Sequence, residues 1–145
     1  MFDVRDCISF LTNHGAKMLS ESMNQMFKEK GGNVTRVQWT ALFYIDLNPG
    51  ITQKELAEKM MIAEPTLLHL IDRMEKDGLV SRAYNKENRR CRYLCLTPAG
   101  EKAFRLLLPV AEQFNKTAVE GIPEADMDTF KRVINQMIEN VNKNV

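Results

Sequence analysis

The segment 51–97 constrains the fold of this chain more than any other part, because the spacing of its apolar residues changes from helical to alternating. It begins with "ITQKEL", in which Thr52 is expected to cap a helix and Glu55 to complete a capping box. Ile51 and Leu56 flank that cap and form a hydrophobic staple. A short helix is therefore predicted to begin immediately after Thr52.

A second helix and a hairpin follow. The first helix reaches about Met60, and Pro65 is placed to open the next, because proline suits the first turn of a helix. "DG" at 77–78 ends that helix. One of its faces is apolar, formed by Leu67, Leu70, Ile71 and Met74. "LVSRAY" and "RYLCLT" then alternate and predict two short paired strands. Two helices followed by such a hairpin indicate a winged helix-turn-helix.

Longer helices flank this core. Residues 4–27 carry one apolar stripe that ends at "KGGN", and "TRVQ" at 35–38 predicts a capping box for a helix that ends at "NPG". After the hairpin, Thr97 and Pro98 begin a helix to about Val119, which Pro109 should kink. "GIPEAD" leads into a last helix. The predicted fold is mainly α, a winged helix-turn-helix flanked by long helices.

Composition narrows the class of protein. The chain has 145 residues, a net charge of +1 and no run of about 18 apolar residues that would span a membrane. No secretory signal is visible, so we expect a cytoplasmic protein. Cys7, Cys91 and Cys95 are expected to be free thiols, because their spacing fits no metal site. No catalytic constellation or phosphate-binding loop is present, so neither an enzyme nor a cofactor is predicted.

The positive charge is concentrated on the turn between the two strands. Residues 85–92 hold four cationic side chains and only one acid. We expect Lys86, Arg89 and Arg90 to contact DNA, with the arginines reaching a minor groove. An ordinary solvated turn is the alternative. Arg82 and Arg92 lie on the strands, and they are either phosphate contacts or surface residues.

The second helix of a helix-turn-helix enters the major groove with its N-terminal residues at the base edges. With the apolar face turned toward the core, several side chains of helix 64–78 point outward or lie on its flanks. His69 and Thr66 can donate hydrogen bonds, and Leu68 or Thr66 can touch a thymine methyl group. The residues predicted to contact DNA on this helix are Pro65, Thr66, Leu68, His69 and Arg73.

The stretch "ITQKELAEKMMIAEPTLLHLIDRMEKDGLVSRAYNKENRRCRYLCLTPAGEKAF" resembles the DNA-binding lobe of the MarR family of bacterial transcription regulators. Its most specific pieces are "LIDRMEKDGLV" and "NRRCRYLCLT". The resemblance implies a homodimer on a palindromic operator in double-stranded DNA, usually a repressor, released by a small, often aromatic effector or by oxidation. It also implies that residues 1–34 and 98–145 form a dimerisation lobe around the DNA-binding lobe, 35–97.

Departures from the family pattern affect the operator and the wing. Asn88 stands where the family usually has an aspartate, so the ion pair from the wing to Arg73 becomes at most a neutral hydrogen bond. Leu68 and His69 replace the family's frequent Ser or Thr and Arg. The operator sequence of relatives therefore does not transfer to this chain.

The resemblance also places an effector pocket between the first, second and fifth helices. The candidates to line it are His14, Met18, Trp39 and Phe43. A core or interface role is the alternative for each. Two other interpretations of the chain stay open: a redox-responsive regulator that senses through Cys7, and a winged helix that binds a protein partner. An enzyme that uses Cys7 or His14 is a remote third.

Overall fold

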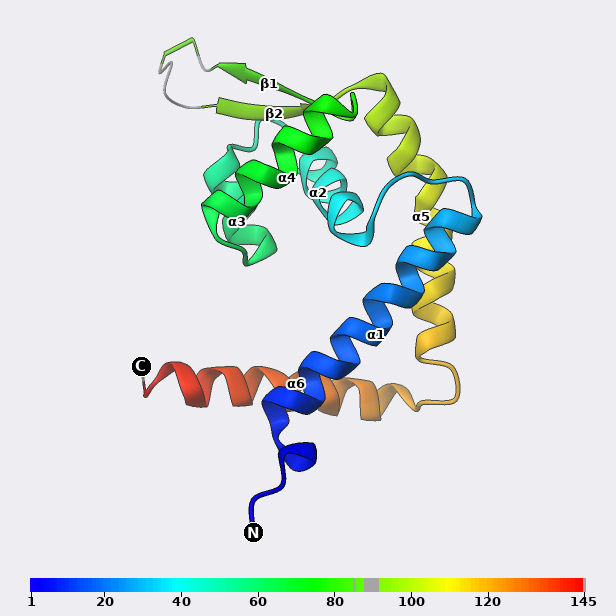
Figure 1. Ribbon diagram of the computed structural model, residues 1–145, viewed down its shortest axis with the longest axis vertical. Coiled ribbons are helices and arrows are strands. Elements are labelled where there is room, and N and C mark those ends of the chain that lie inside the picture. The colour runs from blue at the N-terminus through cyan, green and yellow to red at the C-terminus, as the bar shows by residue number, and fades with distance from the viewer. Residues whose placement is uncertain (85, 88–91, 145) are drawn as a thin grey trace. The chain divides into compact units, whose positions relative to one another are not determined.

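The computed structural model describes residues 1–84, 86–87 and 92–144 (Figure 1). It confirms the predicted mainly α fold with a two-stranded antiparallel hairpin. In chain order the elements are the 3₁₀ turn η1 (Val4–Asp6), α1 (Ile8–Glu29), α2 (Arg36–Leu47), α3 (Gln53–Met60), α4 (Glu64–Lys76), β1 (Val80–Tyr84), β2 (Arg92–Leu96), α5 (Pro98–Ala118) and α6 (Glu124–Asn142).

The chain forms two compact units, Met1–Ala111 and Glu112–Val145. The boundary lies within α5, shortly after Pro109, through which the helix continues. The first unit holds the helix-turn-helix and the hairpin, and the second holds the end of α5 and all of α6. Within the described residues, no helix is long and apolar enough to cross a bilayer.

The capping signals place most helix starts correctly. Thr35 and Gln38 form the predicted capping box, each side chain accepting a hydrogen bond from the backbone N–H of the other, at 3.2 and 3.0 Å. Thr52 caps α3 as predicted, but Glu55 departs from the pattern. Its carboxylate accepts from the Thr52 hydroxyl at 3.1 Å, so the predicted reciprocal bond to the backbone is replaced by a bond between side chains.

The predicted first helix, 4–27, is interrupted near its start. Cys7 has extended backbone angles and separates η1 from α1. Asp3 competes with the helix here, because its carboxylate accepts from the Arg5 backbone N–H at 2.8 Å and pairs with the Arg5 guanidinium. That pairing holds the pKa of Asp3 below its usual value. An apolar stripe alone did not reveal this local competition.

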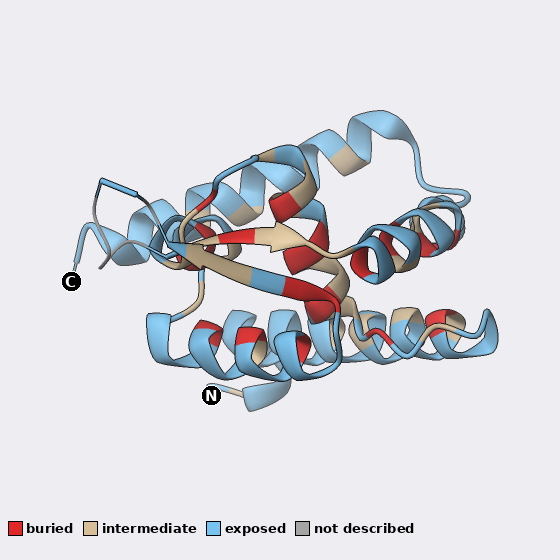
Figure 2. Cartoon of the chain, turned by 90° about the horizontal axis from the view of Figure 1, so that it is seen from above, coloured by how far each residue is buried: buried red, intermediate tan, exposed pale blue. Residues whose placement is uncertain are grey.

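The core lies where α2, α3, α4, the hairpin and the first part of α5 meet (Figure 2). The hairpin is joined to it through the segment just before α3. The Leu94 backbone N–H donates to the carbonyl of Ile51 at 2.8 Å, and Thr52 forms a bridge with Tyr93. Leu94 and Ile51 are themselves buried. The wing therefore begins as an extension of the same core that holds the helix-turn-helix.

A close contact joins the hairpin to α5. Thr97 donates from its hydroxyl to the carbonyl of Gly78 at 2.5 Å, and its backbone N–H donates to the carbonyl of Leu79 at 3.1 Å. Gly100 lies against the same carbonyl of Leu79, where a Cβ atom would come within 1.9 Å. The first turn of α5 is thus seated directly on the joint between α4 and β1.

Candidate DNA-binding surface

Helix α4 buries one face and exposes the opposite one. Leu67, Ile71 and Met74 are fully buried, as their spacing predicts. The other face carries all the residues predicted to contact DNA on this helix, and each of them is exposed: Pro65, Thr66, Leu68, His69 and Arg73. Leu68 is a large apolar side chain that remains 39% exposed. The structure therefore presents these side chains together on one accessible surface.

Arg82 has neither of the two roles expected for it, a phosphate contact or a surface residue. Its side chain is only 11% exposed, so it is neither a solvated surface residue nor available to phosphates. The guanidinium donates to the Asp72 carboxylate at 2.6 Å and to that of Glu75 at 3.2 Å. Its Nε donates to Gln53 at 2.7 Å. Arg82 thus ties β1 to both helices of the helix-turn-helix.

This arrangement has an electrostatic consequence for α4. Asp72 and Glu75 lie on the exposed side of the recognition helix, where their charges would repel phosphate. Pairing with the single positive charge of Arg82 reduces the negative charge of this pair but leaves a net charge of one carboxylate. The predicted link between position 88 and Arg73 falls on a residue outside the described part of the chain, whereas Arg82 joins the wing to α4 within it.

The wing itself is partly described. Its strands pair from Val80 with Leu96 to Tyr84 with Arg92. Arg92 lies over the Tyr84 ring, with its guanidinium carbon 5.4 Å from the ring centroid, and both side chains are exposed. Lys86 is exposed as well. Arg89 and Arg90, the arginines predicted to reach the minor groove, lie outside the described residues, as does Cys91.

The four residues predicted to line the effector pocket separate into two groups. Trp39 and Phe43 belong to an aromatic cluster, in which the Trp39 ring lies 6.1 Å from Phe43 and 5.5 Å from Phe104. Trp39 Nε1 donates to the carbonyl of Phe104 at 3.4 Å. His14 and Met18 are exposed on α1, where His14 stacks on another aromatic ring of the same helix.

Arg36 was not among the residues predicted to line the effector pocket, although it lies one turn before Trp39. Its Nε is buried and has no hydrogen-bond partner among the described residues. Its backbone N–H donates to the side chain of Asn24 on α1 at 2.6 Å. A buried donor without a partner is costly, and any hydrogen-bond acceptor that reaches it, a water molecule or an anionic group, would satisfy it. In the sequence, the only signal was an arginine at the start of a predicted helix, and nothing indicated that its side chain would be buried.

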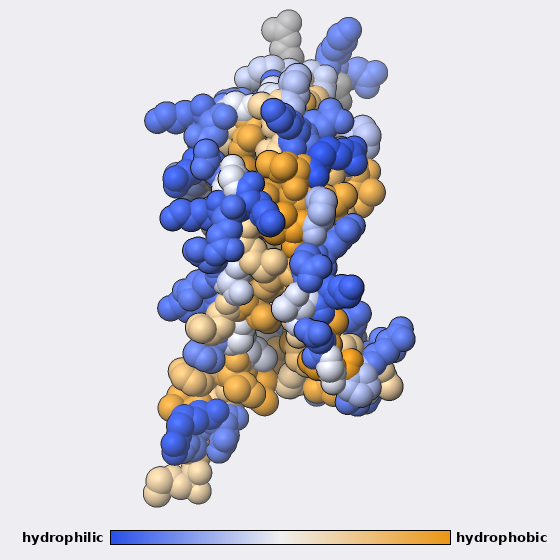
Figure 3. Space-filling view, turned by 90° about the vertical axis from the view of Figure 1, so that its right-hand side faces the viewer, coloured by the Kyte–Doolittle hydropathy of each residue, from blue (hydrophilic) through white to orange (hydrophobic). Residues whose placement is uncertain are grey.

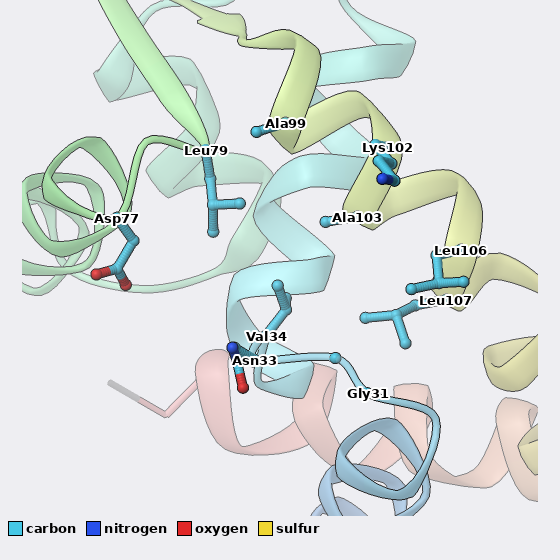
Figure 4. Close-up of a pocket in the computed structure, with 11 residues that line it drawn as sticks. Gly31, Asn33, Val34, Asp77, Leu79, Ala99, Lys102, Ala103, Leu106 and Leu107 are labelled. Atoms are coloured by element: carbon cyan, nitrogen blue, oxygen red, sulfur yellow. The ribbon is translucent and has the colours of Figure 1, made fainter.

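The first unit also holds a pocket of about 470 Å³ (Figure 4). None of the four predicted ligand residues lines it. Its walls come from the connection after α1, the joint between α4 and β1, and the first half of α5: Gly31, Gly32, Asn33, Val34, Asp77, Leu79, Ala99, Lys102, Ala103, Leu106 and Leu107. These segments are far apart in the sequence, so no local pattern predicts the pocket.

Two of the three cysteines lie in the described part of the chain. Cys7 and Cys95 are free thiols there, and both are half-buried. Among the same described residues, no three His, Cys, Asp or Glu side chains gather in a way that would hold a metal ion.

Comparison with known proteins identifies the helix-turn-helix and its wing. Residues 34–91, which run from just before α2 into the wing, match the MarR family. This part of the chain is a MarR-family domain. Among curated relatives of the chain is the uncharacterized HTH-type transcriptional regulator YybA of Bacillus subtilis. It is 27% identical over 128 residues, which cover 88% of this chain and 84% of YybA.

Solved structures share the fold of this chain beyond the matched residues. The S. aureus MepR–DNA complex is similar with a TM-score of 0.84 at 20% identity, covering 97% of this chain and 99% of MepR. The PcaV regulator of Streptomyces coelicolor, solved with its natural ligand, has a TM-score of 0.80 at 18% identity, with 96% of each chain covered. The flanking helices of this chain therefore belong to the shared fold as well.

Proposed function

We propose that this MarR-family protein is a homodimeric, sequence-specific DNA-binding repressor that a small molecule releases from its operator. The observation that carries the proposal is the exposed outer face of α4 beside a wing that Arg82 fixes to it. The recognition helix reads base edges, and the wing, with Lys86, Arg89 and Arg90, contacts phosphates and a minor groove. Such a protein acts on cytoplasmic DNA and needs no catalytic residue.

The relatives support this function. YybA is named a transcriptional regulator, and MepR was solved on DNA. A protein-binding winged helix is the competing function. Protein binding does not explain why positive charge is concentrated on the turn, whereas binding to DNA phosphates does.

Exposed apolar residues on the flanking helices support a homodimer. Helix α6 buries none of its residues, although it carries large apolar side chains that are exposed: Phe130, Val133, Ile138 and Val141. Helix α1 has a similar set, namely Ile8, Phe10, Leu11, Met18 and Leu19. Apolar side chains also reach the surface between charged ones on the face shown in Figure 3. We infer that residues 1–34 and 98–145 pair with a second copy, and that 35–97 binds DNA.

The effector site is proposed at the aromatic cluster. PcaV, which shares the fold, was solved with a ligand. In this chain, Trp39 and Phe43 supply aromatic surface, and the unpartnered Nε of Arg36 is suited to an acidic group. His14 and Met18, which are exposed on α1, stay candidates for the same site. The alternative switch is oxidation of Cys7, which a Cys7→Ser variant separates from ligand release: it keeps its response to a ligand and loses any response to peroxide.

Selection of duplexes from a random pool, followed by anisotropy titration at several salt concentrations, tests the function. A DNA-binding regulator enriches one palindromic sequence and binds it with submicromolar affinity that falls steeply with salt. Absence of enrichment, together with weak binding that is the same for every duplex, would favour the protein-binding alternative.

A further inference from the structure

The leading part of the recognition helix lacks the side chains that usually read bases by paired hydrogen bonds. Residues 61–72 read "MIAEPTLLHLID" and contain no Arg, Lys, Asn or Gln. Arg73 is the first basic residue of α4 and lies in its third turn. Arg82, which contacts this helix from β1, is occupied by Asp72 and Glu75.

The absence of these side chains limits which bases α4 can read in the major groove. Guanine is usually read by Arg or Lys at O6 and N7, and adenine by Asn or Gln at N6 and N7. Neither contact is available in the first two turns of α4. The exposed side chains there offer a proline ring at Pro65, a methyl group at Thr66 and the δ-methyls of Leu68. In the major groove only thymine presents a methyl group for such apolar surfaces to contact.

The one exposed acid of the first turn, Glu64, adds a preference of its own. A carboxylate accepts hydrogen bonds and donates none. Adenine and cytosine carry amino groups that donate in the major groove, whereas guanine presents only acceptors there. Glu64 is therefore compatible with adenine or cytosine and unfavourable opposite guanine.

We propose that α4 recognises its half-site mainly through thymine C5 methyl groups, contacted by Pro65, Thr66 and Leu68, with His69 as the polar contact and Glu64 selecting against guanine. The proposal rests on the proposed function, since it specifies what the DNA-binding surface reads. It assigns base recognition to apolar contact, and it leaves the electrostatic attraction to the wing.

Replacing thymine by deoxyuridine tests the proposal, because it removes the methyl group and keeps the base pair. The probe is the duplex enriched from a random pool by the full-length protein. Substitution within the half-sites should weaken binding by about three- to fivefold for each contacted methyl group. The same substitution in the flanks should have little effect. Circular dichroism checks that each variant used below is folded.

Two variants show whether the weakening arises at α4. In Leu68→Ala, the penalty of deoxyuridine should shrink at one thymine of each half-site, because the contacting side chain is gone. In Lys86→Ala, thymine and deoxyuridine duplexes should both weaken by the same factor. This control shows that weaker binding in itself does not reduce the deoxyuridine penalty. An effect of the methyl groups on DNA shape alone would leave that penalty unchanged in Leu68→Ala as well.

The possible negative results separate failure of this inference from failure of the proposed function. If the selected half-sites are guanine-rich, or if deoxyuridine changes their affinity by less than twofold, the readout by methyl groups is overturned while the DNA-binding function stands. An equal deoxyuridine penalty in the wild type and in Leu68→Ala overturns the role of Leu68. Failure to enrich any duplex defeats the proposed function itself and this inference with it.

Discussion

Arg82 shows how one residue sets the geometry between the wing and the recognition helix. It lies on β1, and its three polar contacts lead to Gln53 on α3 and to Asp72 and Glu75 on α4. In the sequence, its position on a strand was equally compatible with a phosphate contact and with a surface residue. The contacts that decide between these roles join residues up to 29 positions apart, so sequence periodicity carried no information about them.

Replacing Arg82 by Ala should lower the free energy of unfolding by about 1 to 2 kcal/mol. Hydrogen bonds to charged groups contribute about 1.5 to 3 kcal/mol, but both carboxylates are partly exposed and screened by solvent. Urea titration followed by circular dichroism measures the change. Arg92→Ala is the matched control on the neighbouring strand and should change stability by less than about 0.5 kcal/mol. Equal effects of the two substitutions would refute the role assigned to Arg82.

At the scale of elements, local signals predicted most of the fold. Thr35, Thr52, Pro65 and Thr97 begin helices as expected, because caps act within a few residues of the chain. The break at Cys7 was missed because it arises from a competing bond at Asp3. The pocket beside Leu79 was missed because its walls come from three distant segments. The surface of α4 was predicted correctly, since a helical period determines which residues face outward.

Gly100 tests how tightly α5 is seated on the joint between α4 and β1. A Cβ atom there would lie 1.9 Å from the carbonyl oxygen of Leu79, which is backbone and cannot move aside as a flexible side chain would. Gly100→Ala should therefore destabilise the fold by about 3 kcal/mol, at the upper end of overpacking effects. Thermal unfolding measures this, with Ala99→Ser in the same turn as a control of small effect. A Gly100→Ala protein as stable as the wild type would show that this contact is absent in solution.

For the whole molecule, the exposed apolar stripe of α6 predicts a stable dimer. The wild type should sediment at twice the chain mass of 16.7 kDa at micromolar concentration. Phe130→Glu places a charge within the stripe, so it should shift the equilibrium toward monomer or unfold the protein. Arg132→Gln, on the polar side of α6, should remain dimeric. A wild-type monomer at micromolar concentration would contradict the prediction.

A dimer also fixes the spacing of the DNA contacts. Two recognition helices related by a two-fold axis enter successive major grooves on one face of the duplex, about 10 base pairs apart. In this arrangement α4 of each subunit reads bases, while its wing supplies electrostatic attraction. These two contributions depend differently on salt.

The most direct test is a titration series at several salt concentrations, on operator and scrambled duplexes, for the wild type, His69→Ala and Arg90→Ala. Arg90→Ala, in the wing beyond the described residues, should weaken binding to both duplexes and reduce the slope of log K against log salt by about one for each phosphate that the variant no longer neutralises. His69→Ala should keep that slope and narrow the gap between operator and scrambled DNA by about 1 to 3 kcal/mol. If instead Arg90→Ala alters only sequence preference while His69→Ala flattens the salt dependence, the roles assigned to the wing and the recognition helix are contradicted.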